Sequence, residues 1–150
     1  MGELTCYKLK KGGAMKYKKY LVVIVAVLGA LCLAASAQES VTVVPMSKDG
    51  VQRVDIVGGS YFFKPNHIVV KVNIPVELKV SKESGLIPHD IVAKSPEAGI
   101  EFQESMGSTP KIIKFTPTKV GKYPLYCSKK APFSKSHREK GMEGVIEVVP

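Results

Sequence analysis

The chain has 150 residues, and its 22 Lys and Arg against 13 Asp and Glu give a formal charge of +9. This length fits one domain better than two. Six lysines and one glutamate lie before residue 38, so the remainder carries only about +4. Such a mild excess does not indicate a nucleic-acid partner, and we expect none.

The N-terminal 37 residues have the pattern of a secretory signal peptide. The lysines precede an apolar run of 15 residues (21–35), which ends in Ala35-Ser36-Ala37. This pattern predicts cleavage after Ala37 and a periplasmic or secreted protein with no membrane attachment after cleavage. The alternative is a retained membrane anchor, although the run is shorter than the ~20 residues of a typical span. Met15 is an alternative start.

Signal-peptide cleavage would leave a single cysteine in the mature protein. Of the three cysteines, Cys6 and Cys32 precede the cleavage site and only Cys127 follows it. A lone cysteine in an exported protein has no partner for an internal disulfide. Cys127 is therefore either an inert core residue or a reactive thiol or metal ligand.

After residue 38 the sequence consists of short β-rich runs separated by turn residues. In one of them Val76, Leu78 and Val80 alternate with Glu77 and Lys79, which indicates a half-buried strand. The segment 95–106 contains Pro96 and Gly99 and is followed by Gly107, so we expect a loop or a short turn there. Helical periodicity is nearly absent. The pattern predicts an all-β, Greek-key β-sandwich of seven to eight strands over residues 38–150. The β-rich runs are 41–44, 51–57, 61–63, 67–72, 76–80, 90–94, 111–116, 122–127 and 144–149.

Four side chains with soft or imidazole donors stand where loops would meet at one end of such a sandwich. Cys127 follows a strand, His137 and Met142 lie on the next loop, and His89 begins an earlier strand. Two imidazoles, one thiolate and one weak thioether suit a mononuclear copper electron-transfer centre. Taken alone, Cys127 and Met142 are explained as core residues and His89 as a surface histidine. Their joint placement favours a metal-ligand set. His67 begins a strand without a partner motif, and we expect it to be structural.

The segment from about Tyr61 to Val149 resembles the cupredoxin family, the blue copper proteins. PHDIV (88–92) is similar to the PHNIV-type segment of plastocyanin-like proteins, with Asp90 where Asn is usual. KYPLYC (122–127) resembles the strand that carries the copper cysteine, and FKPNHIVVKVNIPVELKVSKES (63–84) resembles the segment leading to the first histidine. The resemblance implies one type 1 copper bound by His89, Cys127, His137 and, axially, Met142.

The ligand loop departs from the small members of that family. Nine residues separate Cys127 from His137 and four separate His137 from Met142, a Cys-x9-His-x4-Met spacing. Such a loop is similar to the type 1 site of copper nitrite reductases. Those enzymes carry a histidine beside the cysteine, whereas Tyr126 and Ser128 flank it here, so a second copper is not supported. Glu143 is an alternative axial ligand, which would give a red copper site.

We expect an exported one-electron carrier between larger redox proteins. The alternatives are a periplasmic copper-binding or delivery protein with the same ligands, or a red-copper protein with a carboxylate ligand. An enzyme is not supported, because the sequence has no paired carboxylates, nucleophile–base pair or open metal site.

The ligand loop also predicts how a partner binds. The resemblance implies that His137 faces solvent and is the exit point for electrons. The basic residues near it are either a solvated loop or a docking face for an acidic redox partner such as a cytochrome or an oxidase. These basic residues are Lys129, Lys130, Lys135, Arg138 and Lys140.

Overall fold

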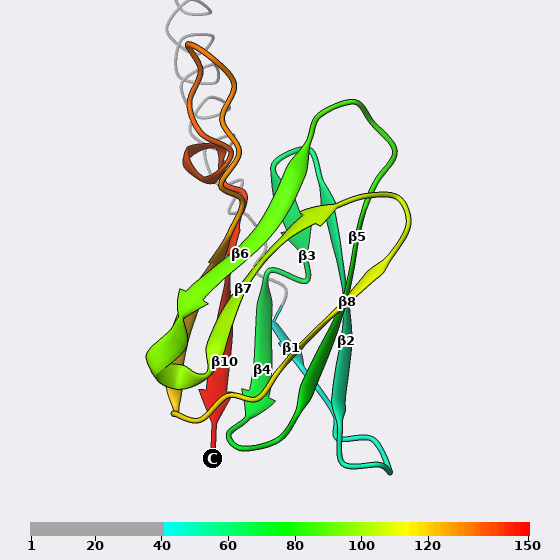
Figure 1. Ribbon diagram of the computed structural model, residues 1–150, viewed down its shortest axis with the longest axis vertical. Helices are drawn as coiled ribbons and strands as arrows, with labels where there is room; N and C mark the ends of the chain where they lie inside the picture. The colour runs from blue at the N-terminus through cyan, green and yellow to red at the C-terminus, as the bar shows by residue number, and fades with distance from the viewer. Residues whose placement is uncertain (1–40) are drawn as a thin grey trace, which may run out of the picture. The chain divides into compact units, whose positions relative to one another are not determined.

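The computed structural model describes residues 41–150, which form a sandwich of two β-sheets (Figure 1). The expected signal peptide (1–37) and its cleavage site lie outside the described residues. No helix within residues 41–150 is long and apolar enough to cross a membrane. The described strands are β1 (Val41–Val43), β2 (Gln52–Gly59), β3 (Phe62–Lys64), β4 (His67–Lys71), β5 (Val76–Lys82), β6 (His89–Ser95), β7 (Ile100–Met106), β8 (Lys111–Phe115), β9 (Gly121–Tyr126) and β10 (Glu143–Val149), with two short 3-10 turns, η2 (Pro96–Ala98) and η3 (Arg138–Lys140).

The two sheets are mixed. One has six strands in the order β1-β4-β10-β9-β6-β7, and the other has four in the order β3-β2-β5-β8. Strand β4 runs parallel to both β1 and β10, and β2 runs parallel to β5, whereas the other pairs are antiparallel. The all-β sandwich expected from the sequence is therefore confirmed.

The core lies between the sheets and comes from alternate positions along the strands. On β5, Val76, Leu78 and Val80 are buried, and Glu77 and Lys79 point outward. Ile56 on β2 and Ile91, Leu125 and Ile146 from the larger sheet fill the same layer. Successive side chains of a strand face opposite sides, so a period of two places every second residue in the core.

The expected strand number was wrong, because the described residues contain ten strands rather than seven to eight. The expected loop over 95–106 is mostly strand β7, which pairs with all of β6 from His89↔Met106 to Ser95↔Ile100. The turn residues bound this strand rather than interrupt it. Pro96 begins η2, Gly99 ends it in the left-handed region with φ 70°, and Gly107 follows the strand.

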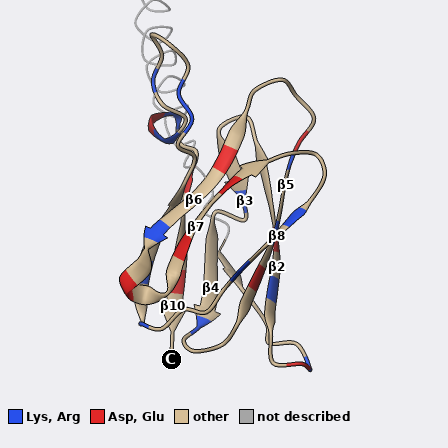
Figure 2. Cartoon of the chain, viewed as in Figure 1, with Lys and Arg blue, Asp and Glu red and all other residues tan. Residues whose placement is uncertain are grey.

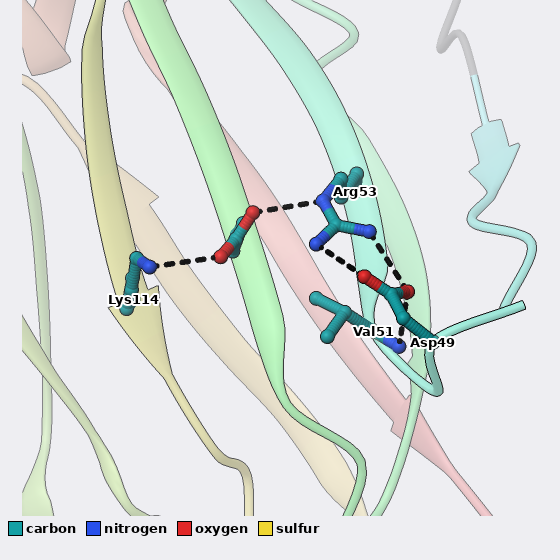
Figure 3. A network of polar contacts seen from close by, with 5 residues as sticks. Asp49, Val51, Arg53 and Lys114 are labelled. Carbon is teal, nitrogen blue, oxygen red and sulfur yellow. Dashed lines mark hydrogen bonds and ion pairs between the residues drawn. The ribbon is translucent and has the colours of Figure 1, made fainter. Parts of the chain in front are cut away.

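A polar network lies on the outward face of the smaller sheet (Figure 3). Arg53 on β2 bonds both carboxylate oxygens of Asp49 and also Glu77 on β5, and Glu77 bonds Lys114 on β8. Lys114 and then Arg53 lower the pKa of Glu77. These pairs match the strand register Arg53↔Glu77↔Lys114, so they favour that pairing although exposed ion pairs contribute little energy.

Candidate metal centre

Three connections meet at one end of the sandwich. The β2–β3 turn, the β5–β6 loop and the β9–β10 loop all lie at the upper end in Figure 1, opposite the C-terminus. The β5–β6 loop delivers His89 as the first residue of β6, and β9 ends immediately before Cys127. Because these two strands are rigid parts of one sheet, their ends fix the positions of the two side chains.

The structure brings His89, Cys127 and His137 together. The Cys127 Sγ lies 3.5 Å from the His137 Nδ1 and 3.9 Å from the His89 Nδ1, and the two Nδ1 atoms are 3.1 Å apart. Donor atoms placed about 2.0 Å (N) and 2.3 Å (S) from one ion at trigonal angles would lie ~3.5–3.8 Å apart. The three atoms therefore have nearly the separations of a trigonal metal site, and this triangle fits the copper expected from the sequence.

Burial sets the protonation of the three donors. The three residues are at most 5% exposed. Burial is the largest influence on each: it lowers the pKa of His89 and of His137 and raises the pKa of the Cys127 thiol. The imidazoles are therefore neutral and ready to bind a metal, whereas the thiol keeps its proton until a metal displaces it.

Backbone hydrogen bonds tie Met142 to this cluster. The Cys127 N–H donates to the Met142 carbonyl (3.1 Å), and the Met142 N–H donates to the His137 carbonyl (2.9 Å). The Met142 side chain is fully buried. Glu143, the alternative axial residue, lies outside: its side chain is 54% exposed and bonds Arg138 at 3.0 Å. Of the two axial candidates from the sequence, Met142 is therefore buried and tied to the cluster, whereas Glu143 faces outward.

A second thioether, which the sequence did not indicate, lies beside the first. Met106 is the cross-strand partner of His89, and directly opposed residues of antiparallel strands project from the same face. A Cβ on Gly58 would lie 3.1 Å from the Met106 Sδ and 3.3 Å from the Met142 Cε. Gly58 thus leaves room for both methionines. Met106 has no signal in the sequence, because its position depends on the pairing of β7 with β6, and the turn residues around 95–106 indicate a loop.

The long β9–β10 loop folds back on itself. Lys130 and Ser136 form a β-bridge, and the His137 N–H donates to the Lys129 carbonyl (2.9 Å). Phe133 lies between them with φ 56° and is fully exposed. The nine residues after Cys127 thus form a small hairpin that returns the chain to place His137. Gly141, with φ 97°, then redirects it into β10.

Asp90 joins the two ligand-bearing segments. Its carboxylate accepts hydrogen bonds from the Ser128 N–H (2.7 Å) and the Ser128 Oγ (2.6 Å), and its own N–H points at the Cys127 Sγ (3.5 Å). Burial raises the pKa of Asp90, but the bonds with Ser128, together with Cys127 and the Lys129 cation, outweigh it and the net pKa is lowered. A charged carboxylate therefore stands beside the cysteine, and Lys129 lies 3.7 Å from it.

Two expectations about histidines have different outcomes. His67 lies on β4, apart from the cluster, with its Nε2 2.7 Å from Glu147 on β10, in keeping with a structural residue. His137 does not face solvent as expected, because only 4% of it is exposed. Tyr61, from the β2–β3 turn, lies edge-on against it with ring centroids 4.9 Å apart. The sequence carried no signal for this contact.

No protein-family model and no curated protein matches the chain. Solved structures do match. The metal-binding domain of the Streptococcus pneumoniae Cu(I)-exporting P-type ATPase CopA, determined with Cu(I), is 22% identical, with a TM-score of 0.56 over 76% of this chain and 100% of that one. A copper binding protein in its apo form is 18% identical, with a TM-score of 0.51 over 74% and 99%. Auracyanin A, a blue copper protein of Chloroflexus aurantiacus, is 18% identical, with a TM-score of 0.50 over 67% and 100%. The described β-sandwich therefore has the cupredoxin fold.

Proposed function

We propose that this protein is an exported one-electron carrier with a single type 1 copper bound by His89, Cys127 and His137 and, axially, by Met142. The observation that carries the proposal is the triangle of buried donor atoms, with sides of 3.1, 3.5 and 3.9 Å. The fold it shares with auracyanin A is consistent with this proposal.

The residues of the chain would serve this role by holding the ligands still. Copper, when bound, supplies a metal that accepts and releases one electron. The strands hold His89 and Cys127, and backbone bonds join Met142 to Cys127 and His137. Burial excludes water from the donors. A site that keeps its geometry in both oxidation states needs little rearrangement when an electron passes. We propose no enzymatic role.

The second candidate is a copper-binding or delivery protein, and Met106 is the observation that favours it. Two thioethers beside a thiol make a soft donor set, which suits Cu(I). In this role His89, Cys127, His137 and Met142 would still bind the metal, with the Met106 thioether beside them, but the protein would hand over the metal rather than an electron.

The optical and paramagnetic spectra of the copper-loaded protein separate the two. As a carrier, it should show an intense thiolate-to-copper band in the visible range, which disappears on reduction and returns on oxidation. Its Cu(II) spectrum should have the narrow hyperfine splitting of a type 1 site. A colourless protein that yields Cu(I) readily to a chelator would support delivery instead.

We further propose that the basic β9–β10 loop docks an acidic redox partner, such as a cytochrome or an oxidase. Blue segments mark its lysines and arginine in Figure 2. Some of them have local contacts: Arg138 pairs with Glu143 and lies 4.6 Å from the Tyr126 ring, and Lys140 lies 4.5 Å from the Tyr61 ring. Lys130 and Lys135 are exposed and are the better candidates for docking.

The rate at which hexacyanoferrate(III), an anionic oxidant, oxidises the reduced protein tests whether the positive charge of this loop attracts an acidic partner. The double variant Lys130→Glu/Lys135→Glu should react about tenfold more slowly at low ionic strength, because favourable charge raises association rates. The difference should shrink as salt is added. Lys48→Glu, in the exposed β1–β2 turn far along the chain from the loop, is the control. Each Lys→Glu change lowers the net charge by two, so Lys48→Glu should have about half the effect of the double variant on the logarithm of the rate if net charge alone matters; that result would contradict a docking face.

A further inference from the structure

Tyr61 covers the two candidate histidine ligands from the opposite sheet. Its ring centroid lies 4.9 Å from that of His137 and 6.2 Å from that of His89, with interplanar angles of 76° and 85°. Edge-to-face contact is a favoured arrangement of aromatic rings. His89 directly follows the β5–β6 loop, and His137 lies within the β9–β10 loop. Neither histidine is more than 5% exposed, although loops at the end of a sandwich usually face solvent. The tyrosine ring is thus a direct reason why a centre built on loops is closed to solvent.

The β2–β3 turn holds Tyr61 in a conformation that a tyrosine seldom adopts. Its φ is 66°, in the left-handed region, and its N–H donates to the Gly59 carbonyl at 2.7 Å. Gly59 permits the turn, because a Cβ there would overlap the Phe62 ring. A non-glycine residue persists in this region only where its surroundings over-determine it, and such residues concentrate at functional sites. The turn therefore aims this ring at the histidines against its backbone preference.

Lys140 holds the cover from the ligand loop. Its Nζ lies 4.5 Å from the centre of the Tyr61 ring and 3.3 Å from the Tyr61 hydroxyl, an arrangement that combines a cation–π contact with a hydrogen bond. Lys140 belongs to η3, whose N-cap is His137. Lys140, which contacts the Tyr61 ring, and His137, which the ring covers, thus lie on the same short element.

A small cavity lies beside the cover. Its volume is about 60 Å³, and Gly59, Ser60, Gly85, Ile87 and His89 are among the residues that line it. The turn that carries Tyr61 therefore forms one wall of a space that already reaches a ligand.

We infer that Tyr61 is the cover of the metal centre, held by Lys140, and that reagents and copper reach Cys127 by displacement of this ring. The inference rests on the proposed function only for the identity of the metal. Tyr61 is a positioning and shielding residue here, and it is assigned no part in binding the copper.

The accessibility of Cys127 in the metal-free protein tests the cover. Tyr61→Gly removes the ring, and glycine adopts the positive φ of this position without steric strain, so this variant should fold. We expect iodoacetamide to alkylate Cys127 about tenfold faster in it, which corresponds to an opening easier by ~1.4 kcal/mol. Mass spectrometry of the peptide containing Cys127 gives the rate without contribution from Cys6 and Cys32. Lys140→Met should give a smaller increase in the same direction.

Tyr126→Ala is the matched control. Tyr126 also stands beneath a cation, with Arg138 4.6 Å from its ring centre, and it directly precedes Cys127. Its removal should leave the alkylation rate unchanged. An unchanged rate in Tyr61→Gly would overturn the inference, and so would an equal increase in Tyr126→Ala, which would indicate general loosening. A blue, copper-loaded protein with an unchanged Tyr61→Gly rate would refute the cover alone. A colourless protein whose Cys127 becomes faster to alkylate would instead refute the carrier.

Discussion

Cys127→Ser is expected to abolish the visible colour of the copper-loaded protein and to weaken copper binding by at least ~100-fold, more than the loss of an outer-shell partner usually costs. A serine oxygen is a poor substitute for a thiolate, which supplies both the strongest soft donor and the charge-transfer band. The measurements are the copper content after gel filtration, the visible spectrum and the paramagnetic spectrum.

The fold should survive this change. Cys127 is fully buried and serine has nearly its shape, so the far-ultraviolet circular dichroism should be unaltered. His67→Gln is the control, because it changes a buried histidine that bonds Glu147 outside the cluster, and it should keep full copper and colour. A Cys127→Ser protein that retains both the metal and the colour would show that the centre is not built on this thiol.

Asp90→Ala is expected to lower the free energy of unfolding of the metal-free protein by roughly 2–4 kcal/mol, since hydrogen bonds to a charged group contribute ~1.5–3 kcal/mol. The buried carboxylate accepts two bonds from Ser128, and its loss leaves the Ser128 N–H without that partner. The same bonds join the segment of His89 to that of Cys127, so the copper spectrum of the variant should also change.

Two further variants isolate the cause of this loss. Asp90→Asn keeps an oxygen for the Ser128 N–H and should lose less stability than Asp90→Ala. Asp55→Ala removes a carboxylate that is 68% exposed and pairs with Lys79 at 3.3 Å, so it should change stability by at most ~0.5 kcal/mol. Chemical denaturation measures all three. If Asp90→Ala is as stable as Asp55→Ala, Asp90 does not join the two segments.

Much of the fold could be predicted from local patterns. The alternation of Val76, Leu78 and Val80 predicted β5, because the period of a strand is visible in a few consecutive residues. Strand β7 was missed because the glycines and proline around it mark its ends, and a sequence pattern does not distinguish an end from an interruption. The segment forms a strand because it pairs with β6, and this contact between separate segments is not visible in a local pattern.

The donors that this protein can offer a metal could be identified from the amino-acid sequence. His89, Cys127, His137 and Met142 were identifiable because ligand chemistry belongs to the side chain and survives any change of backbone. Export of the protein, through the signal peptide expected over residues 1–37, stays a prediction.

The surroundings of these donors, in contrast, depend on the tertiary structure. The bonds between Asp90 and Ser128 join residues 38 positions apart, and the contact of Lys140 with Tyr61 joins residues 79 apart. The outward position of Glu143, the approach of Met106 to Met142 and the burial of His137 beside Tyr61 likewise depend on how strand ends and loops meet. Such contacts follow from the packing of distant segments, which no local pattern records.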